Sequence, residues 1–305
     1  MASGGPQVAA AAVPGDRASW ADLLAKPRPL IMGVVNITPD SFADGGLYFS
    51  PELALRHALD LAEAGADILD LGGESTRPFS EPLPLEEELR RVIPVIAQLR
   101  PRVSLPLSID TYKAPVARAA LEAGADIIND ISALRFDPHM APLAREARAP
   151  VILMHMQGVP RDMQTNPHYD DLLGEIKAFL AQRRDFALSQ GIPLDRIVLD
   201  PGIGFGKTFQ HNLEIINNFD TFTDLGCPLL IGPSRKAFIG HLLGGLPPAE
   251  RDVGTLAALA VAVARGAAVV RVHNVRLARQ FFTVFRAITA ASRISSAKVK
   301  GHMPL

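Results

Sequence analysis

The fold is decided by the stretch Glu63-Ala-Gly-Ala-Asp-Ile-Leu-Asp70, because it recurs almost unchanged as Glu122-Ala-Gly-Ala-Asp-Ile-Ile-Asn129. A third copy of the pattern is Arg265-Gly-Ala-Ala-Val-Val-Arg271. In each copy a glycine suits the left-handed end of a helix, and the aliphatic residues after it suit a strand that is buried on both faces. The repeated joint between helix and strand predicts a chain of alternating helices and parallel strands.

Eight short apolar runs extend this pattern along the whole chain, with helical periodicity between them. The predicted strands are 29–36, 67–72, 105–111, 126–130, 151–156, 196–200, 229–233 and 268–273. Helical periodicity is clearest over 51–64, 85–99, 170–189 and 251–265. Eight successive strand and helix units predict an α/β fold, a single (β/α)8 TIM barrel, whose catalytic groups lie at the carboxyl ends of the strands.

The length of 305 residues fits one such barrel, which normally takes about 250 residues. We predict a flexible N-terminal tail over 1–28, a barrel over 29–293 and a flexible C-terminal tail over 294–305. The formal net charge of -1 gives no electrostatic basis for binding nucleic acid or a membrane surface. No apolar run approaches the roughly 18 residues of a membrane span, so we expect a cytoplasmic protein. The single cysteine, Cys227, is expected to be a buried packing residue.

Polar residues end the predicted strands, and in a barrel these ends meet at one rim. They are Asn36, Asp70, Asp110, Asn129 with Asp130, His155, Asp200, Ser234, and Arg271 with His273. Asp130 points away from its neighbour Asn129 on a strand, so we interpret it as structural. His155 is interpreted as a core residue, because a lone inward histidine is usually a hydrogen-bonded packing group.

Four longer motifs surround these strand ends. They are Gly33-Val-Val-Asn-Ile-Thr-Pro-Asp-Ser-Phe-Ala-Asp-Gly45, Asp70-Leu-Gly-Gly-Glu-Ser-Thr-Arg-Pro78, Asp200-Pro-Gly-Ile-Gly-Phe-Gly-Lys207 and Gly232-Pro-Ser-Arg-Lys236. Together with Ser108-Ile-Asp-Thr111 and Arg271-Val-His273, and in this order, they resemble the dihydropteroate synthase family over about residues 29–275. The resemblance implies the folate-pathway reaction that joins 6-hydroxymethyl-7,8-dihydropterin pyrophosphate to p-aminobenzoate, releases pyrophosphate and needs Mg2+.

The resemblance implies a pterin site at the strand ends. Asp110 and Asp200 would each accept a pair of N–H bonds from the pterin ring, and Asn129 would both donate and accept. Each aspartate could instead cap the next helix. Lys236 would contact the carbonyl edge of the pterin. The alternative is a solvated loop lysine, although its neighbour Arg235 could equally be the exposed residue. Met154 would pack against the pterin face, and Gly232 also belongs to the implied substrate-binding set.

Arg271 and His273 lie two residues apart on a strand and so share one face, where they form a cationic ledge suited to the leaving pyrophosphate. The resemblance implies that Ser234 receives the carboxylate of p-aminobenzoate, although a plain helix N-cap explains this serine equally well. We expect Arg271, His273, Lys236 and Asp110 to be the catalytic residues. The amine of p-aminobenzoate is neutral, so the main task is to help pyrophosphate leave.

Two long loops and a glycine-rich run complete the expected site. Phe42 and Asp44 in the first loop, and Thr76, Arg77 and Pro78 in the second, would enclose p-aminobenzoate, although disordered surface loops remain the alternative. Phe205 would complete the aromatic wall. Its run ends in Gly206-Lys207-Thr208 but has no earlier Gly at the spacing of a P-loop, so a nucleotide site is not favoured.

The resemblance assigns the Mg2+ contact to Asn36, whose neutral oxygen suits a hard cation already bound to substrate phosphates. It also implies sulfonamide analogues of p-aminobenzoate as competitors, and a homodimer. A corrinoid-dependent methyltransferase would use the same pterin pocket but would not need the ledge of Arg271 and His273. A catalytically inactive pterin-binding subunit would show gaps in the catalytic set, and the sequence shows none.

Overall fold

The structure is a computed structural model that describes residues 20–26, 29–38, 51–75 and 80–291. Eight parallel strands form one sheet in the order β6-β5-β4-β3-β2-β1-β8-β7. They are β1 (Leu30–Asn36), β2 (Ile68–Gly72), β3 (Leu107–Asp110), β4 (Ile127–Asp130), β5 (Val151–Met154), β6 (Ile197–Asp200), β7 (Leu230–Ile231) and β8 (Val269–Val272). A parallel bridge between Leu199 and Leu229 joins the two edges of the sheet. The predicted (β/α)8 barrel is therefore confirmed.

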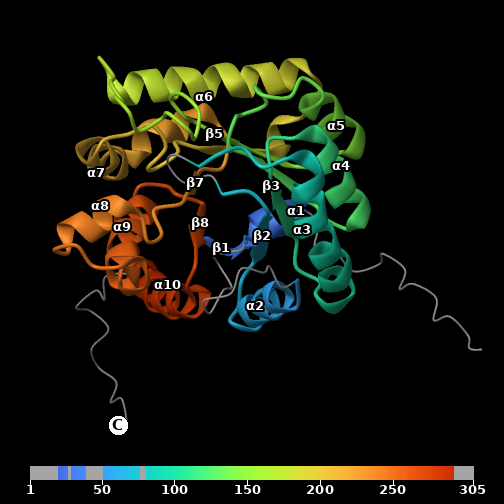
Figure 1. Ribbon diagram of the computed structural model, residues 1–305. Helices are drawn as coiled ribbons and strands as arrows, with labels where there is room; N and C mark the ends of the chain where they lie inside the picture. The colour runs from blue at the N-terminus through green and yellow to red at the C-terminus, as the bar shows by residue number, and fades with distance from the viewer. Residues whose placement is uncertain (1–19, 27–28, 39–50, 76–79, 292–305) are drawn as a thin grey trace, which may run out of the picture.

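Helices surround the strands, as Figure 1 shows. They are α1 (Trp20–Ala25), α2 (Pro51–Glu63), α3 (Leu85–Leu99), α4 (Ala114–Ala123), α5 (Met140–Ala147), α6 (Leu172–Ser189), α7 (Phe209–Asn217), α8 (Ala237–Leu242), α9 (Asp252–Ala264) and α10 (Val275–Ala290). Short 3-10 turns are η2 (Arg100–Arg102), η3 (Leu194–Arg196), η4 (Phe219–Leu225) and η5 (Pro248–Glu250). Among the described residues, no helix is both long and apolar enough to cross a membrane.

The repeated joints behave as the sequence predicts. Gly65, Gly124 and Gly266 have φ angles of 94°, 114° and 102°, in the left-handed region that favours glycine. At Gly124 the backbone N–H donates to the carbonyls of Ala120 and Leu121 and so ends α4. Each joint reverses the chain and starts the next buried strand.

Two apolar layers hold the barrel together. The larger lies between the strands and the surrounding helices, and it includes Val270 and Val272 of β8. The smaller fills the inside of the barrel near the starts of the strands, with Leu30, Met32, Ile68, Ile127, Ile152, Val198, Leu230 and Val269. Alternate residues of one strand thus face the two layers.

Helix α1 closes the base of the barrel. Leu23 is fully buried in the inner layer, and Trp20 donates an indole N–H bond of 2.6 Å to the carbonyl of Asp195. The structure therefore differs from the predicted flexible tail at residues 20–26, because a short helix is stabilised there by the apolar floor of the barrel. Residues 1–19 and 292–305 lie outside the described residues.

The observed strands are shorter than the predicted ones, most of all β7. Proline explains two of the boundaries, since Pro106 precedes β3 and Pro233 follows β7, and proline cannot donate to a ladder. Cys227 is buried, as expected, and burial raises the pKa of its thiol to about 11.

Candidate active site

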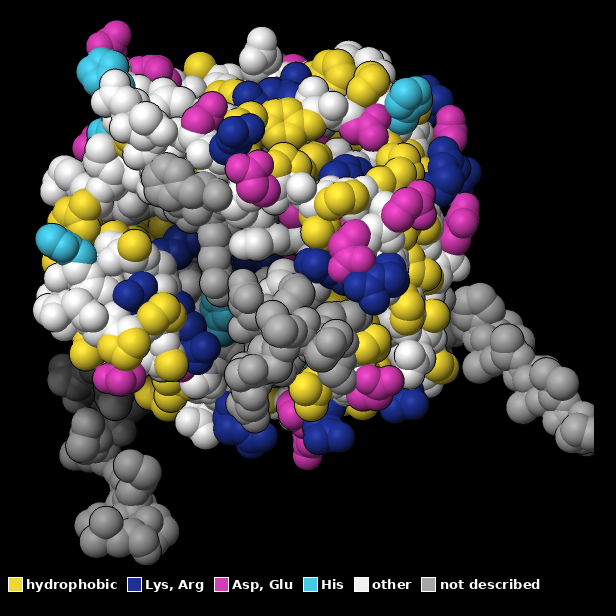
Figure 2. Space-filling model, in the orientation of Figure 1, with side chains coloured by type: hydrophobic (Ala, Val, Ile, Leu, Met, Phe, Trp, Pro, Cys, Tyr) yellow, Lys and Arg dark blue, Asp and Glu magenta, His cyan; other side chains and the backbone are white. Residues whose placement is uncertain are grey.

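The carboxyl ends of the strands bring most of the expected residues to one rim. The register pairs Asp110 with Asn129 between β3 and β4, and Met154 with Asp200 between β5 and β6. Asn36 pairs with Gly72 at the end of β1. Lys and Arg side chains surround the centre of the face seen in Figure 2. Residues far apart in the sequence therefore share one polar surface.

Arg271 is held between two carboxylates. Its Nε lies 2.6 Å from Asp70 Oδ2, and another guanidinium nitrogen lies 2.9 Å from Asp110 Oδ2. Asn129 Nδ2 donates to the same oxygen of Asp70 at 3.1 Å. Burial disfavours the Arg271 cation, but Asp70 and Asp110 outweigh this effect and raise its pKa. Arg271 is thus a fixed cation, and Asp70, given no role from the sequence, positions it.

Asp110 keeps one oxygen for a ligand. Among the described residues, Oδ1 of Asp110 is buried without a hydrogen-bond partner, and so are Asp70 Oδ1 and Ser108 Oγ. Burial, followed by the charge of Asp70, raises the pKa of Asp110 to about 7, whereas Arg271 opposes the shift. Lys113 is the N-cap of α4, so the helix-cap reading of Asp110 is wrong. A buried acceptor without a donor fits a ligand that supplies N–H groups.

Asp200 accepts a bond of 2.7 Å from the backbone N–H of Gly202 through Oδ1. Helix α7 has Thr208 as its N-cap, so Asp200 does not cap the helix that follows. Burial raises the pKa of Asp200, against the opposing bond from Gly202 and the charge of Lys236. Asp130 accepts from the backbone N–H groups of Ser132 and Leu134, which fits the structural role expected for it.

Lys236 faces the rim and Arg235 does not. Nζ of Lys236 donates to the carbonyl of Ile203 and lies 4.5 Å from the centre of the Phe205 ring, whereas Arg235 pairs with Asp252 at 2.7 Å. Burial lowers the pKa of Lys236 to about 7. A side chain at Gly204, whose φ is +79°, would come within 2.9 Å of Lys236. The glycine-rich run thus allows the backbone to approach this lysine.

Ser234 and His273 form a pair of their own. The hydroxyl of Ser234 lies 2.9 Å from His273 Nδ1 and accepts the backbone N–H of His273 at 3.2 Å. The N-cap of α8 is Lys236, so the N-cap reading of Ser234 is wrong. Arg271 lies in β8 and His273 directly follows the end of that strand, and each has its own partners.

Lys207 is the site residue that the sequence analysis missed. Its side chain is only 1% exposed, and Nζ lies 2.9 Å from His155 Nδ1 and 3.0 Å from the carbonyl oxygen of Phe205. The one available signal is a lysine directly after a buried strand and its glycine run. His155 packs edge-on against Phe179 with ring centres 4.8 Å apart, so its reading as a core residue is confirmed.

Phe42, Asp44, Thr76, Arg77 and Pro78 lie outside the described residues. Just before the second of these segments, Glu74 accepts bonds from Lys113 Nζ at 2.6 Å and from the Tyr112 hydroxyl at 2.7 Å. Lys113 also bonds Glu88, whose pKa is raised by burial. This ion-pair network holds the start of the predicted second loop at the rim.

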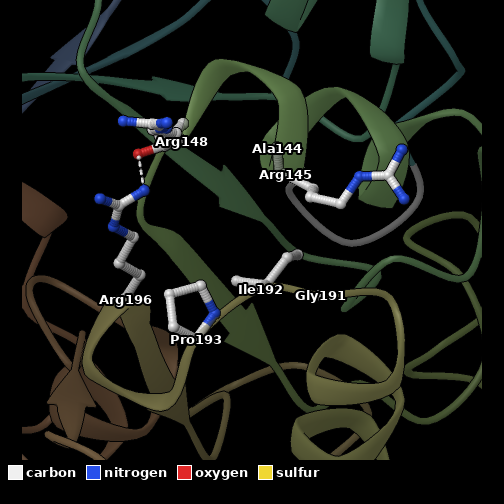
Figure 3. Close-up of a pocket in the computed structure, with 8 residues that line it drawn as sticks. Ala144, Arg145, Arg148, Gly191, Ile192, Pro193 and Arg196 are labelled. Atoms are coloured by element: carbon white, nitrogen blue, oxygen red, sulfur yellow. Dashed lines mark hydrogen bonds between the residues drawn. The ribbon is translucent and has the colours of Figure 1, made fainter.

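A surface hollow of about 260 Å³ lies away from this rim, beside the starts of β5 and β6. Figure 3 shows Arg145, Arg148 and Arg196 around it, with Arg196 donating to the carbonyl of Arg148 at 2.8 Å. Since catalytic groups of a barrel gather at the carboxyl ends of its strands, this hollow is not the candidate site.

Comparison with known proteins agrees with this geometry. The pterin binding enzyme family matches residues 32–273. A dihydropteroate synthase of Synechocystis sp. is 46% identical over 261 residues, which cover 86% of this chain and 90% of the relative. The chain belongs to the dihydropteroate synthase family. The rim residues from Asn36 to His273 all fall within the matched region.

Solved structures of dihydropteroate synthase share the barrel. The Xanthomonas albilineans protein with 4-aminobenzoic acid has a TM-score of 0.84 and 46% identity, over 90% of this chain and 99% of that chain. The same protein with 7,8-dihydropteroate has a TM-score of 0.80 and 45% identity, over 88% and 96%. The Yersinia pestis protein in a sulfonamide drug complex has a TM-score of 0.82 and 40% identity, over 87% and 95%.

Proposed function

We propose that the chain is a dihydropteroate synthase, a transferase of folate biosynthesis that condenses 6-hydroxymethyl-7,8-dihydropterin pyrophosphate with p-aminobenzoate. The products are 7,8-dihydropteroate and pyrophosphate. The observation that carries the proposal is the buried oxygen of Asp110 that has no partner within the described part of the chain, beside the fixed cation of Arg271, in a chain of this family. Acceptors for a nitrogen-rich ring and a cation for its leaving group stand at the same rim.

The pterin is held by groups that match its ring. Asp110 and Asp200 accept its N–H groups, and Asn129 pairs with its donor and acceptor edge. Met154 is buried beside Ile131 and Met156, with Phe205 packed against them, and this polarisable surface suits one face of the ring. Gly232 lies opposite Arg271, where an added Cβ would sit 3.6 Å from the arginine side chain.

The reaction breaks the bond between the pterin methylene carbon and the pyrophosphate oxygen and forms a bond from that carbon to the arylamine nitrogen. The nitrogen then loses one proton to solvent. Arg271 and His273 stabilise the departing pyrophosphate, and Asp110 and Asp200 stabilise positive charge on the pterin methylene. Arg271 is well suited to this role because two carboxylates fix its orientation before the substrate arrives.

Lys236 contacts the carbonyl edge of the pterin, and the arylamine binds between Phe205 and Ser234 in this scheme. The Ser234 hydroxyl receives the carboxylate of p-aminobenzoate. We assign Phe42, Asp44, Thr76, Arg77 and Pro78, which lie outside the described residues, to the same substrate site. Sulfonamides compete for the same place. Family structures that contain 4-aminobenzoic acid and a sulfonamide drug support p-aminobenzoate and sulfonamides as ligands.

Magnesium fits the site as a cation carried by the substrate. Among the described residues, no group of three or more His, Cys, Asp or Glu side chains is arranged to hold a metal. Asn36, partly exposed at the end of β1, offers a single neutral oxygen, which suits a Mg2+ that keeps waters and phosphate oxygens as its other ligands. When bound, Mg2+ offsets charge on the leaving pyrophosphate. Asn36→Ala should raise the Mg2+ concentration needed for half-maximal activity.

We also propose a homodimer formed through α9 and α10. Their outer face carries an apolar groove lined by Leu256, Leu277, Gln280, Phe281, Val284, Phe285 and Ile288. Val284 is 60% exposed and Ile288 69% exposed, which favours burial against a second copy. Analytical ultracentrifugation should find a dimer for the native chain and a monomer for Ile288→Lys. A cytoplasmic location remains our expectation, and cell fractionation tests it.

The deciding experiment measures pyrophosphate release from the pterin substrate with and without p-aminobenzoate. The proposal expects release that depends on both substrates and falls when a sulfonamide is added. Methyl transfer from a methylated folate to cobalamin, without pyrophosphate release, would instead identify the chain as a corrinoid-dependent methyltransferase. Pterin binding without any turnover would instead favour an inactive binding subunit.

A further inference from the structure

Lys207 is a buried amine that the proposed reaction does not use. It follows Gly206 in the glycine-rich segment 201–208, where a lysine is normally solvated. Its Nζ instead contacts His155 Nδ1 and the Phe205 carbonyl oxygen, at 2.9 and 3.0 Å. Burying an amine lowers stability unless hydrogen bonds compensate, and an apolar side chain would fill the same volume without that penalty. The two hydrogen bonds are therefore what the amine contributes.

The protonation of the pair supports these bonds. Burial, followed by the charge of Lys207, lowers the pKa of His155 well below its ordinary value. A neutral histidine leaves Nδ1 able to accept a hydrogen bond from Lys207. Burial likewise lowers the pKa of Lys207, against the opposing charge of Asp200. Both an amine and an ammonium group can donate to Nδ1 and to the carbonyl.

The backbone around Lys207 is tied to the loop that follows β5. The side-chain amide of Gln164 bonds both the N–H and the carbonyl of Lys207, at 3.1 and 3.3 Å. The Tyr169 hydroxyl donates to the carbonyl of Gly206 at 2.7 Å. A side chain at Gly206 would come within 2.6 Å of the Gln157 carbonyl. The glycine-rich segment therefore lies in close contact with this loop. The Lys207 side chain adds its bond to His155, the first residue after β5.

Phe205 connects the buried bonds of Lys207 to the rim. Its carbonyl is held by Lys207, and its ring lies 4.5 Å below the Lys236 ammonium group. A carbonyl fixed on one side of a residue limits the backbone rotation that would swing its ring away. The position of the Phe205 ring thus depends on a buried bond that does not touch the ligand.

We propose that Lys207 is a positioning residue, whose bonds to His155 and to the Phe205 carbonyl fix the Phe205 ring as a wall of the arylamine site. This inference rests on the proposed function, since it assigns p-aminobenzoate to that wall. Lys207 does not touch the reacting atoms. Its loss should weaken arylamine binding more than pterin binding at Asp110 and Asn129.

The first test replaces Lys207 by Met, which keeps the length and removes the donors. We expect KM for p-aminobenzoate to rise by about tenfold, as for the loss of one positioned hydrogen bond, with pterin affinity lowered by a clearly smaller factor, since Phe205 borders the Met154 surface of the pterin site only at its edge. The matched control is Lys177→Met on α6, where the lysine pairs with Asp224 at the surface. An unchanged KM in Lys207→Met, or an equal rise in the control, would overturn the inference.

A double-mutant cycle separates positioning from general loosening of the fold. If Lys207 acts through the Phe205 ring, Lys207→Met should add little to the KM of a Phe205→Ala variant. Additive effects would show that Lys207 acts by some other route and would contradict the proposal. Thermal unfolding of every variant verifies that the compared proteins are folded.

The same assays keep the two proposals apart. If the native chain releases no pyrophosphate, the proposed function fails; if it does and Lys207→Met behaves like the control, only the positioning role fails. Should Lys207→Met not fold, the side-chain NMR signal of Lys207 in the native chain decides. The inference expects this signal to shift when p-aminobenzoate binds with the pterin and pyrophosphate, and an unmoved signal would refute it.

Discussion

The two ends of the barrel are built from the same strands but serve opposite purposes. At the base, inward side chains are apolar and α1 covers them. Further along the strands the inward side chains are polar, and one oxygen each of Asp70 and Asp110 has no partner in the described structure. Four strands show this change, each between an apolar residue and the polar residue two positions later. The pairs are Ile68 and Asp70, Ile127 and Asn129, Val198 and Asp200, and Val269 and Arg271. The base supplies packing energy, and the rim carries groups whose partners come from a ligand.

The largest effect on the rim side of this comparison is expected from Arg271→Ala. Removing one fixed electrostatic stabiliser should lower kcat by about 10²–10³-fold. Steady-state pyrophosphate release measures it. Arg265→Ala, which removes an arginine that pairs with Asp220 at the surface, is the matched control and should keep normal turnover. A near-normal rate for Arg271→Ala would contradict the mechanism.

At the base, Ile127→Ala should lower stability and leave turnover nearly unchanged. Deleting a fully packed side chain leaves a cavity and should lower the free energy of unfolding by ~2–4 kcal/mol. The turnover of the folded protein should stay close to normal, because Ile127 lies below Asn129 on β4. Urea unfolding and kcat are measured on the same samples. Leu242→Ala, on α8 at a position that is 57% exposed and outside the proposed dimer groove, should change stability by less than about 0.5 kcal/mol.

Asp200→Asn tests whether a rim residue can lose its ligand-binding role while the fold stays intact. Asparagine can still accept the bond from Gly202 through its oxygen, so the fold should stay intact. Its NH2 group would face the donors of the pterin, and calorimetry should show affinity reduced by about tenfold or more. Asp195→Asn, on the exposed η3 turn near the base, should bind the pterin normally. Unchanged affinity in Asp200→Asn would remove Asp200 from the pterin site.

The smallest effect expected is a pH dependence of pterin binding. Burial and Asp70 raise the pKa of Asp110 to about 7, so its acceptor form increases as pH rises through that value. Pterin affinity should therefore strengthen by about tenfold in total between about pH 6 and pH 8. Lys236 also titrates near 7, but its neutral amine still donates. The pH dependence should disappear in Asp110→Asn, and its persistence there would implicate another group.

The sequence predicts the barrel well because the signals are local. A glycine that ends a helix and a short aliphatic run that follows it identify each joint, and strand ends in a parallel barrel must share a rim. The same logic correctly brings Asp110, Asn129, Asp200 and Arg271 together.

Pairing across the barrel is less accessible from sequence. The bond from Arg271 to Asp70 spans 201 positions of the chain, so no local pattern reveals that the expected ledge is already paired. A lysine among glycines reads as exposed, yet Lys207 is buried because His155 and Phe205 supply its partners. Helix α1 has too few residues to show a periodicity, and it forms where the apolar base of the barrel can stabilise it.

The pairing between neighbouring strands is not equally extensive around the barrel. In the described chain, β7 has only two residues, and one isolated bridge links Leu229 to Leu199 of β6. Amide hydrogens on this seam should exchange with solvent sooner than those between β1 and β2, where five residue pairs are in register. The seam flanks the segments that carry Phe205 and Lys236, and β6 on one side of it ends in Asp200, so transient parting of the wall would loosen the arylamine slot and the Asp200 side of the pterin site together.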